Sequence, residues 1–148
     1  MAERGKTPSR ALLKPLVAMH NLIYRTSGGR IWGHFGKGPV LLLTVNGRKT
    51  GKPQTVPLIY VQTDRGHAVI ASFAGSPTHP AWYLNLDAAG VAEIQIGARR
   101  RRVTAAHVAY GSPAYSDIWR RAVVLYPDYE TYKTRTARPI PIVELVAQ

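Results

Sequence analysis

The short apolar run VLLLTV at residues 40–45 constrains the fold more than any other feature of this sequence. A run of this length followed at once by the turn signal Asn46-Gly47 is typical of a strand that is buried on both faces. Further strands are predicted at 54–62, 67–73, 91–96, 99–109 and from Ile140 onward, and Pro53 and Pro57 favour an edge or a bulge in the first of these. Many short strands with few helices predict a β-rich α+β domain, most simply a small closed or split β-barrel.

Short helices are predicted to flank this barrel. Residues 9–25 form an amphipathic pattern with one narrow basic face, in which Pro15 either introduces a kink or marks the first helical turn. A second helix is predicted at 80–87. A third starts at the cap Ser112-Pro113 and stops before Pro127, which can begin one further turn. We therefore expect a basic amphipathic extension over residues 1–26 and one barrel domain over residues 27–148.

The charge of the chain indicates an anionic partner. Its 148 residues include 20 Lys and Arg against 8 Asp and Glu, a formal net charge of +12. This excess favours nucleic acid, an acidic membrane surface, or a phosphorylated or carboxylated ligand. The sequence has no cysteine, so disulfides, thiolate catalysis and cysteine-based zinc sites are excluded.

The sequence also carries an expectation about location. No segment approaches the roughly 20 apolar residues that a membrane span needs, and the amino terminus lacks the apolar core of a signal peptide. We expect a cytoplasmic protein. The apolar faces of the helix at 9–25 either pack on the barrel or make a peripheral contact with the inner face of the membrane.

The most informative loop joins the first two predicted strands and reads NGRKTGK, residues 46–52. It places Arg48, Lys49 and Lys52 together with the hydroxyl of Thr50 in a short glycine-containing turn. Glycines allow backbone N–H groups to turn toward an anion, while Arg supplies a planar fork and Lys a point charge. A phosphate or a carboxylate would bind well there, although a solvated hairpin tip fits the charge equally. The spacing and the strand-to-strand context exclude a Walker A loop.

Four consecutive arginines at residues 99–102 invite a nucleic-acid interpretation. On a strand, however, side chains alternate, so two of these arginines point to each face. We favour an exposed edge strand protected by charge. Nucleic acid binding is not expected, because no recognisable helix-turn-helix, zinc finger or RNA-recognition motif accompanies the run.

Conventional catalytic groups are missing from the sequence. The five histidines are scattered, with no HExxH spacing and no carboxylate cluster beside them, so we predict no metal site. No G-x-S-x-G elbow and no pair of carboxylates indicates hydrolytic chemistry.

Aromatic residues gather in the last third of the chain. Tyr126, Tyr129 and Tyr132 recur at every third residue around Pro127, which makes the last two near neighbours on a helix. Three tyrosines can form a flat amphipathic wall for a planar ligand, with hydroxyls available as donors. The alternative is a satellite core that seals one end of the barrel.

Three segments, taken in order, resemble one family: VLLLTVNGRKTGKPQTVPL, IASFAGSPTHPAWYLNL and YPDYETYKTRTARPIPIV. From about Pro39 to Val143 the chain resembles the deazaflavin-dependent nitroreductases, and its amino-terminal helix is similar to theirs. The resemblance implies a split β-barrel related to the flavin-mononucleotide oxidoreductases. It also implies coenzyme F420, whose deazaflavin ring, phosphodiester and polyglutamate tail make a long polyanion with a flat head.

The resemblance implies site residues as well. The reduced deazaflavin would carry the hydride, while the protein supplies position and electrostatics. The cofactor-binding set would be Arg48, Lys49, Thr50, Gly51, Lys52, Pro53, Pro57, Ala71, Ser72, Phe73, Trp82, Tyr83 and Asn85. The acceptor pocket would comprise Ile59, Tyr126, Tyr129 and Tyr132. Tyr129 would orient or protonate the acceptor, with Ser72 as a second hydrogen-bond donor, and these two are the expected catalytic residues.

Differences between this sequence and the family pattern at two positions affect which acceptor we expect. Members that activate nitroimidazoles have Lys where this chain has Phe73 and Tyr where it has Ile59, so the pocket here is more apolar. We expect a hydride to pass from reduced coenzyme F420 to a planar acceptor (a quinone, an enone or a nitroaromatic). A quinone, which can be a lipid-soluble one, or an enone is favoured over a nitroaromatic. Alternatives are a split-barrel oxidoreductase that uses flavin mononucleotide, and a non-enzymatic basic module that binds membranes or nucleic acid. We expect a monomer rather than a homodimer.

Overall fold

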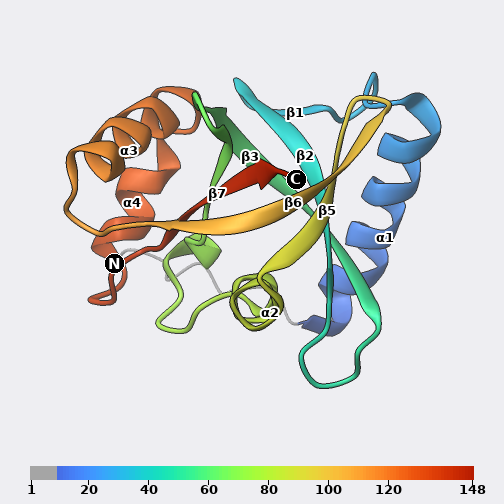
Figure 1. The fold of residues 1–148 in the computed structure, drawn as a ribbon, viewed down its shortest axis with the longest axis horizontal. Coiled ribbons are helices and arrows are strands. Elements are labelled where there is room, and N and C mark those ends of the chain that lie inside the picture. The colour runs from blue at the N-terminus through green and yellow to red at the C-terminus, as the bar shows by residue number, and fades with distance from the viewer. Residues whose placement is uncertain (1–9) are drawn as a thin grey trace.

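The computed structural model describes residues 10–148, so residues 1–9 of the predicted extension lie outside the described part of the chain. Six strands form a closed antiparallel barrel (Figure 1). In order around the barrel they are β2 (Gly38–Asn46), β3 (Pro53–Gln62), β4 (Gly66–Ile70), β7 (Ile142–Ala147), β6 (Arg99–Val108) and β5 (Val91–Ile96), and β5 pairs back with β2. A two-residue strand, β1 (His34–Phe35), extends this sheet beside β2. The predicted β-rich α+β barrel is confirmed.

Alternation along β2 explains why its central run is buried on both faces, with only Thr44 partly exposed. Leu41, Leu43 and Val45 belong to the cluster that fills the barrel, whereas Val40 and Leu42 point outward and pack against Tyr24. The run at residues 40–45 is therefore buried on both faces, as predicted.

Helix α1 (Arg10–Ser27) covers the outer face of β2. Its Tyr24 is almost fully buried, and the Tyr24 hydroxyl donates to the carbonyl of Val40 at 2.9 Å and accepts from the N–H of Gly97 at 2.9 Å. These contacts hold the described part of α1 against the barrel. Pro15 lies inside α1, so it does not mark the first turn. Among residues 10–148 no helix is long and apolar enough to cross a membrane.

Three more helices complete the fold (Figure 1). Helices α3 (Pro113–Leu125) and α4 (Asp128–Thr134) cover the outer face of β4 and β7, where they pack on Ala68, Ile70 and Ile142. Helix α2 (Ala81–Ala89) closes one end of the barrel, because its Trp82 and Leu86 join the interior cluster. Helix α3 begins where predicted, since the Ser112 hydroxyl accepts from the N–H of Tyr115 at 3.1 Å.

The barrel is split along one edge of β3. This strand pairs with β2 from Pro53 to Ile59, but its ladder with β4 covers only Tyr60 to Gln62. Pro57 lies in the first stretch, where β3 has a partner strand on one side only, and such an edge tolerates a residue without an N–H. The predicted edge in this strand is confirmed.

The predicted strand at 67–73 is too long, and this is the main correction to the expected elements. Strand β4 ends at Ile70, and the chain then turns through the short 3-10 helix η1 (Phe73–Gly75). Phe73, Ala74 and Gly75 have φ of 46°, 52° and 75°, a left-handed backbone that cannot continue a strand. Other differences are smaller: β1 was not predicted, the strand at 99–109 ends at Val108, and the last strand begins at Ile142 rather than Ile140.

Candidate active site

The cationic turn joins β2 to β3 at the barrel end that α2 closes (Figure 1). Two backbone hydrogen bonds shape it, from the N–H of Gly47 to the carbonyl of Lys52 and from the N–H of Gly51 to the carbonyl of Gly47, each 2.8 Å. Gly51 has φ of 70°, and no atom lies within 4 Å of the position that its Cβ would take. The turn therefore presents Lys49, Lys52 and its backbone to solvent.

Asn85 of α2 fixes the direction of Arg48. The buried Asn85 Oδ1 accepts from the backbone N–H of Arg48 at 3.1 Å and from its Nη1 at 2.8 Å. An amide oxygen is neutral, so the guanidinium is oriented while its charge is retained. None of the ion pairs formed by the described residues involves Arg48, Lys49 or Lys52. The turn is therefore a set of cations whose field no carboxylate of the described chain neutralises.

Pro57 and Ile59 lie on the outer face of β3, beside the split in the barrel. Ile59 packs outward against the cluster that contains Tyr24. If the ladder between β3 and β4 continued beyond its last pair, Tyr60 with Val69, its register would set Pro57 opposite Ser72. The ladder ends instead, so the free edge of β3 and the segment that carries Ser72 border the same split.

Four further residues of the predicted cofactor-binding set divide between the core and the surface. Ala71 and Trp82 are buried in the cluster that fills the barrel, whereas Phe73 and Tyr83 are half-buried. The ring of Tyr83 lies 4.9 Å from that of His79, measured between centroids. Ala71 and Trp82 therefore contribute to the core at this end of the barrel, whereas the side chains of Phe73 and Tyr83 are partly accessible to a ligand.

The three tyrosines form one aromatic cluster. Tyr129 is 5% exposed and packs against Trp119. Tyr126 and Tyr132 are half-buried, and a hydrogen bond of 2.9 Å joins their hydroxyls. Burial raises the pKa of Tyr129, and burial together with the hydrogen bond to Tyr132 raises the pKa of Tyr126. Both are therefore neutral phenols at neutral pH, which can donate hydrogen bonds.

The tyrosine cluster and the loop that carries Ser72 are neighbours. A Cβ at Gly75 would stand 2.6 Å from the carbonyl oxygen of Tyr132, so only glycine allows α4 and η1 to approach this closely. The Arg135 guanidinium lies over the ring of Tyr132, 5.5 Å from its centroid, and Nη1 of Arg135 lies 3.5 Å from the carbonyl of Ala74. The structure therefore assembles two separate groups of predicted residues. One consists of the β2–β3 turn and Asn85, and the other consists of Ser72 and the three tyrosines.

Three residues of this region were not predicted: His79, Arg135 and Arg138. Arg138 donates to backbone carbonyls of the loop at residues 71–76 and approaches the ring of His79. These partners lie 59 to 67 residues away in sequence. No local motif marks such a contact, because an arginine that binds carbonyls needs no special neighbours in the sequence.

Two cavities lie beside these groups rather than within them. One, of about 420 Å³, lies between the start of α3, the end of α4 and the segment that precedes β7, and it shares Arg138 with the site. The other, of about 220 Å³, is lined by the β3–β4 turn and by Arg101 at the opposite end of the barrel. Most of the predicted site residues thus line neither cavity, and they lie instead around the surface between the edge of β3 and the Ser72 loop.

A six-stranded antiparallel barrel whose β3–β4 ladder is split places this chain in the class of split-barrel proteins. A solved F420-H2 dependent reductase (FDR-A) is 35% identical to this chain, with a TM-score of 0.65 over 72% of this chain and 93% of its own. An F420H(2)-dependent quinone reductase of Mycobacterium tuberculosis strain H37Rv is 40% identical over 133 residues, which are 88% of this chain and 89% of that protein.

The model of one family, described as F420H(2)-dependent quinone reductase, matches residues 16–147. The chain belongs to this family. Membership confirms the predicted split-barrel fold, the oxidoreductase activity and reduced coenzyme F420 as the cofactor. It therefore favours the leading prediction over flavin mononucleotide and over a non-enzymatic binding module.

One finding does not fit the expectation of a monomer. A second solved structure, described as a domain-swapped dimer, is 29% identical to this chain, with a TM-score of 0.68 over 91% of this chain and 97% of its own. The residue assignments and the boundary between residues 26 and 27 stay predictions.

Proposed function

We propose that this protein passes a hydride from reduced coenzyme F420 to a quinone, and that the β2–β3 turn anchors the anionic part of the coenzyme. The observation that carries the proposal is the set of cations in this turn, which is oriented by a neutral partner, Asn85, and matched by no carboxylate of the described chain. Hydrogen bonds between such cations and phosphate or carboxylate oxygens are about twice as strong as neutral ones. A ligand with several anionic groups fits this turn.

Each part of the site has a separate task in this proposal. When bound, the coenzyme supplies the hydride, and the protein supplies position and electrostatics. Arg48, Lys49 and Lys52 bind phosphodiester and carboxylate oxygens. Pro57 and Ile59 offer an apolar surface to the flat ring and keep water from it, while the Ser72 hydroxyl donates a hydrogen bond to the ring edge. Holding the ring and the acceptor face to face reduces the entropy cost of the transfer.

The tyrosines orient the acceptor in the same proposal. A quinone oxygen gains negative charge as the hydride arrives, and donors already aimed at that oxygen stabilise the charge. The raised pKa values of Tyr126 and Tyr129 make these phenols poor sources of a proton, so each keeps the O–H group with which it can donate a hydrogen bond. We therefore assign Tyr129 and its neighbours to orienting the acceptor rather than protonating it.

A pair of titrations tests the cofactor. The purified full-length protein is titrated with coenzyme F420 by fluorescence, beside a matching titration with flavin mononucleotide. We expect saturable binding of coenzyme F420 in preference to the flavin, followed by oxidation of the reduced coenzyme when menadione is added. Absence of saturable F420 binding would contradict the proposal, and binding without menadione reduction would remove the quinone from it.

A second candidate function, contact with a membrane, is supported by the surface of α1. Leu16, Met19 and Leu22 are 58%, 48% and 62% exposed on this helix. Lys14 and Arg25 of the same helix are exposed cations, which suit an anionic lipid surface. We infer that α1 lies on such a surface and keeps the site near a lipid-soluble quinone.

Co-sedimentation with vesicles tests this contact. We expect the triple variant L16Q/M19Q/L22Q to lose binding to vesicles that contain phosphatidylglycerol, while F420 binding is retained. The variant V124Q is a matched control, because Val124 is an apolar residue 69% exposed on another helix. Equal sedimentation of the wild type and both variants would remove α1 from any contact with the membrane.

A further inference from the structure

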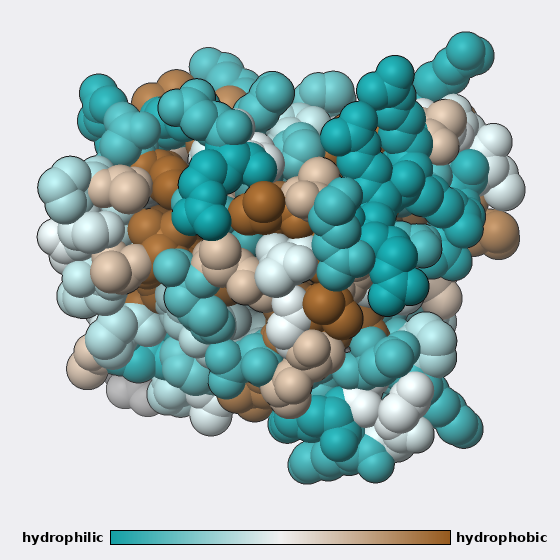
Figure 2. All heavy atoms as spheres, in the orientation of Figure 1, coloured by the Kyte–Doolittle hydropathy of each residue, from teal (hydrophilic) through white to brown (hydrophobic). Residues whose placement is uncertain are grey.

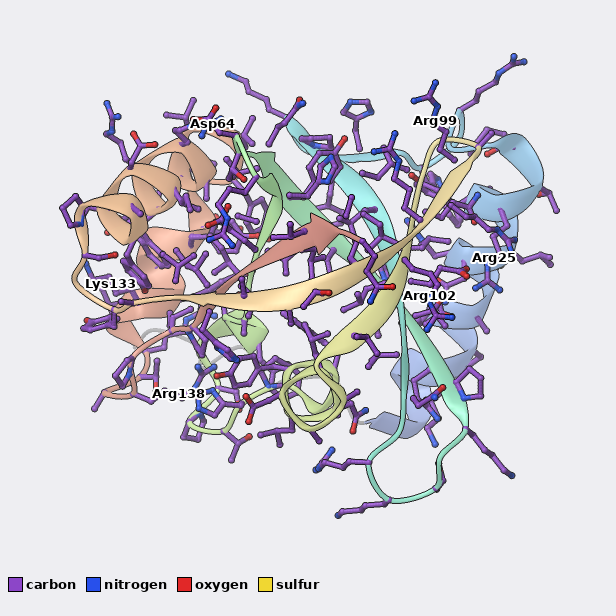
Figure 3. The ribbon with its side chains drawn as sticks, viewed as in Figure 1. Arg25, Asp64, Arg99, Arg102, Lys133 and Arg138 are labelled. Carbon is purple, nitrogen blue, oxygen red and sulfur yellow. The ribbon has the colours of Figure 1, made fainter. Side chains whose placement is uncertain are left out.

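One guanidinium spans the loop that carries Ser72. Arg138 donates from Nη2 to the carbonyl of Ser72 at 2.8 Å, from Nε to the carbonyl of Ser76 at 2.9 Å, and from Nη1 to the carbonyl of Ala71 at 3.2 Å. Nη1 also lies 3.1 Å from Nδ1 of His79. Figure 3 shows Arg138 far from Asp64 and Arg99, which lie at the opposite end of the barrel. A single side chain therefore holds both ends of the loop at residues 71–76.

The loop that Arg138 holds has an unfavourable backbone. Phe73 and Ala74 have φ of 46° and 52°, a conformation that residues with a side chain rarely adopt. Such residues persist only where the surrounding structure fixes them, and they gather at functional sites. The two sides of this turn are fixed by Arg138 at Ala71, Ser72 and Ser76 and by the close approach of Tyr132 at Gly75.

Arg138 is held by neutral groups rather than by a carboxylate. Its side chain is half-buried, none of the ion pairs between described residues includes it, and burial lowers its pKa. Three carbonyl oxygens and an imidazole nitrogen accept instead. Only the planar fork of arginine reaches several acceptors in one plane, whereas lysine is a compact point charge. The geometry of the fork, rather than a charge pair, accounts for this arginine.

We propose that Arg138 is a positioning residue, which fixes the strained loop at residues 71–76 so that Ser72 meets the coenzyme ring. This inference rests on the proposed function, since it takes Ser72 to contact the ring. Arg138 itself does not touch the coenzyme in this proposal. It acts through the backbone of the loop, and it thereby connects the segment before β7 to the split of the barrel.

Two substitutions and a matched control test the inference in the full-length protein. R138Q removes the fork, and R138K keeps the charge but loses the fork. The control R135Q removes an exposed arginine whose guanidinium makes one hydrogen bond to the same loop, a long one of 3.5 Å, and it keeps the Cβ that packs beside Gly75. Thermal unfolding of each variant shows whether it folds, and R138K remains informative if R138Q does not.

Hydrogen–deuterium exchange of the loop is the first readout, measured without coenzyme. We expect peptides that cover residues 71–79 to exchange about tenfold faster in R138Q, to a lesser extent in R138K, and at the wild-type rate in R135Q. The second readout is kinetic. The KM for reduced coenzyme F420 should rise about tenfold in R138Q, with a smaller rise in R138K, while the KM for menadione changes less than about twofold.

The outcomes separate the two proposals. Wild-type exchange of the loop in R138Q would show that Arg138 does not hold it. Faster exchange with an unchanged coenzyme KM would show that the loop does not position the coenzyme, which overturns the inference. If the wild-type protein does not bind coenzyme F420 at all, the proposed function fails and the positioning role fails with it, while the exchange data still decide whether Arg138 holds the loop.

Discussion

Both ends of the barrel are basic, but only one of them has the geometry of a site. Hydrophilic side chains cover the β2–β3 turn and the β5–β6 hairpin alike (Figure 2). At the hairpin end, Glu144 accepts from the Thr63 hydroxyl at 2.8 Å and lies 3.9 Å from Arg65. At the turn end, Arg48 and Arg138 are held by an amide, an imidazole and carbonyl groups. Oriented cations without a carboxylate mark an anion site better than the number of cations does.

The four arginines at residues 99–102 lie at the hairpin end, and they too show that many cations do not by themselves make an anion site. In the β5–β6 ladder, Arg101 is opposite Ile94 and Arg102 is opposite Glu93, so the side chains alternate as predicted. The ladder between β6 and β7 begins only at Val103, and the carbonyl of Arg102 accepts from the N–H of Gln148 at 3.1 Å, which leaves residues 99–101 paired on one side. A charged strand edge resists pairing with another sheet. The run is explained by this protection, without a ligand.

The largest expected effect comes from removing the cations at each end in turn. The triple variant R48Q/K49Q/K52Q should weaken coenzyme F420 binding about 100-fold, because each lost charge-assisted hydrogen bond contributes about 1.5–3 kcal/mol and the effects do not add fully. The matched variant R65Q/R101Q removes two cations at the hairpin end and should change the Kd less than about threefold. Equal losses in both variants would mean that net charge alone binds the coenzyme, and the comparison would fail.

The tyrosine cluster should show the next largest effect. Substituting Tyr126, Tyr129 or Tyr132 by Phe should lower kcat about tenfold with menadione while F420 binding is retained, because a donor to the acceptor oxygen is lost. The matched control is Y115F. The Tyr115 hydroxyl donates to the carbonyl of Ile140 at 2.6 Å, so Y115F should cost about 1 kcal/mol of stability and leave kcat unchanged. Unchanged turnover in all three cluster variants would remove their assigned role.

Asn85 should have a smaller but separable effect. In N85A, Arg48 loses the acceptor of two hydrogen bonds, so we expect about fivefold weaker F420 binding and a stability loss of about 1–2 kcal/mol. Asn46, an exposed residue at the start of the same turn, provides the control N46A. Fluorescence titration and urea unfolding measure the two effects. Identical behaviour of N85A and N46A would show that the direction of Arg48 does not matter.

The smallest expected effect is a dependence on pH at both ends. Burial lowers the pKa of His79, with a further contribution from Arg138, and burial lowers the pKa of His67, with a further contribution from Arg101. The unfolded chain therefore binds protons more readily, and the stabilising contribution of each histidine, present above about pH 6.5, is lost as the pH falls through its folded-state pKa. H79Q and H67Q should each reduce the loss of stability in acid, measured by urea unfolding at about pH 7.5 and pH 5.5.

Activity at the same two pH values distinguishes the two histidines. Protonation of His79 Nδ1 would set an N–H against Nη1 of Arg138 and weaken the contact to the loop. The acid-induced rise in the KM for reduced coenzyme F420 should therefore diminish in H79Q and persist in H67Q. If the KM for reduced coenzyme F420 depended on pH in the same way in both variants, protonation of His79 would have no effect on the loop.

The positions of most strands along the chain were predictable from local patterns, whereas their order around the barrel was not predicted. The apolar run at residues 40–45 and the cap at Ser112 act through neighbouring residues, so their outcome can be derived from the sequence itself. The boundary of β4 could not be derived in this way. Apolar residues continue beyond Ile70, yet the backbone is helical at Ser72 (φ −76°, ψ −36°) and left-handed at Phe73, so the strand cannot continue through them. Arg138, 65 positions further along the chain than Phe73, holds that backbone, and no residue near Phe73 in the sequence predicts this contact.

By itself, the sequence determined the β-rich barrel, the cationic turn, the three neighbouring tyrosines and a resemblance that led to the family. The strands, the cationic turn and the tyrosine spacing each depend on residue types within one segment, where periodicity and turn chemistry act over a few residues, and the resemblance depends on three such segments in order. Only the tertiary structure decided that Asn85 orients Arg48, that the ladder between β3 and β4 stops at Tyr60, and that Arg138 fixes the loop of Ser72. These contacts join distant segments, and their geometry exists only once the barrel has closed and brought those segments to the same end.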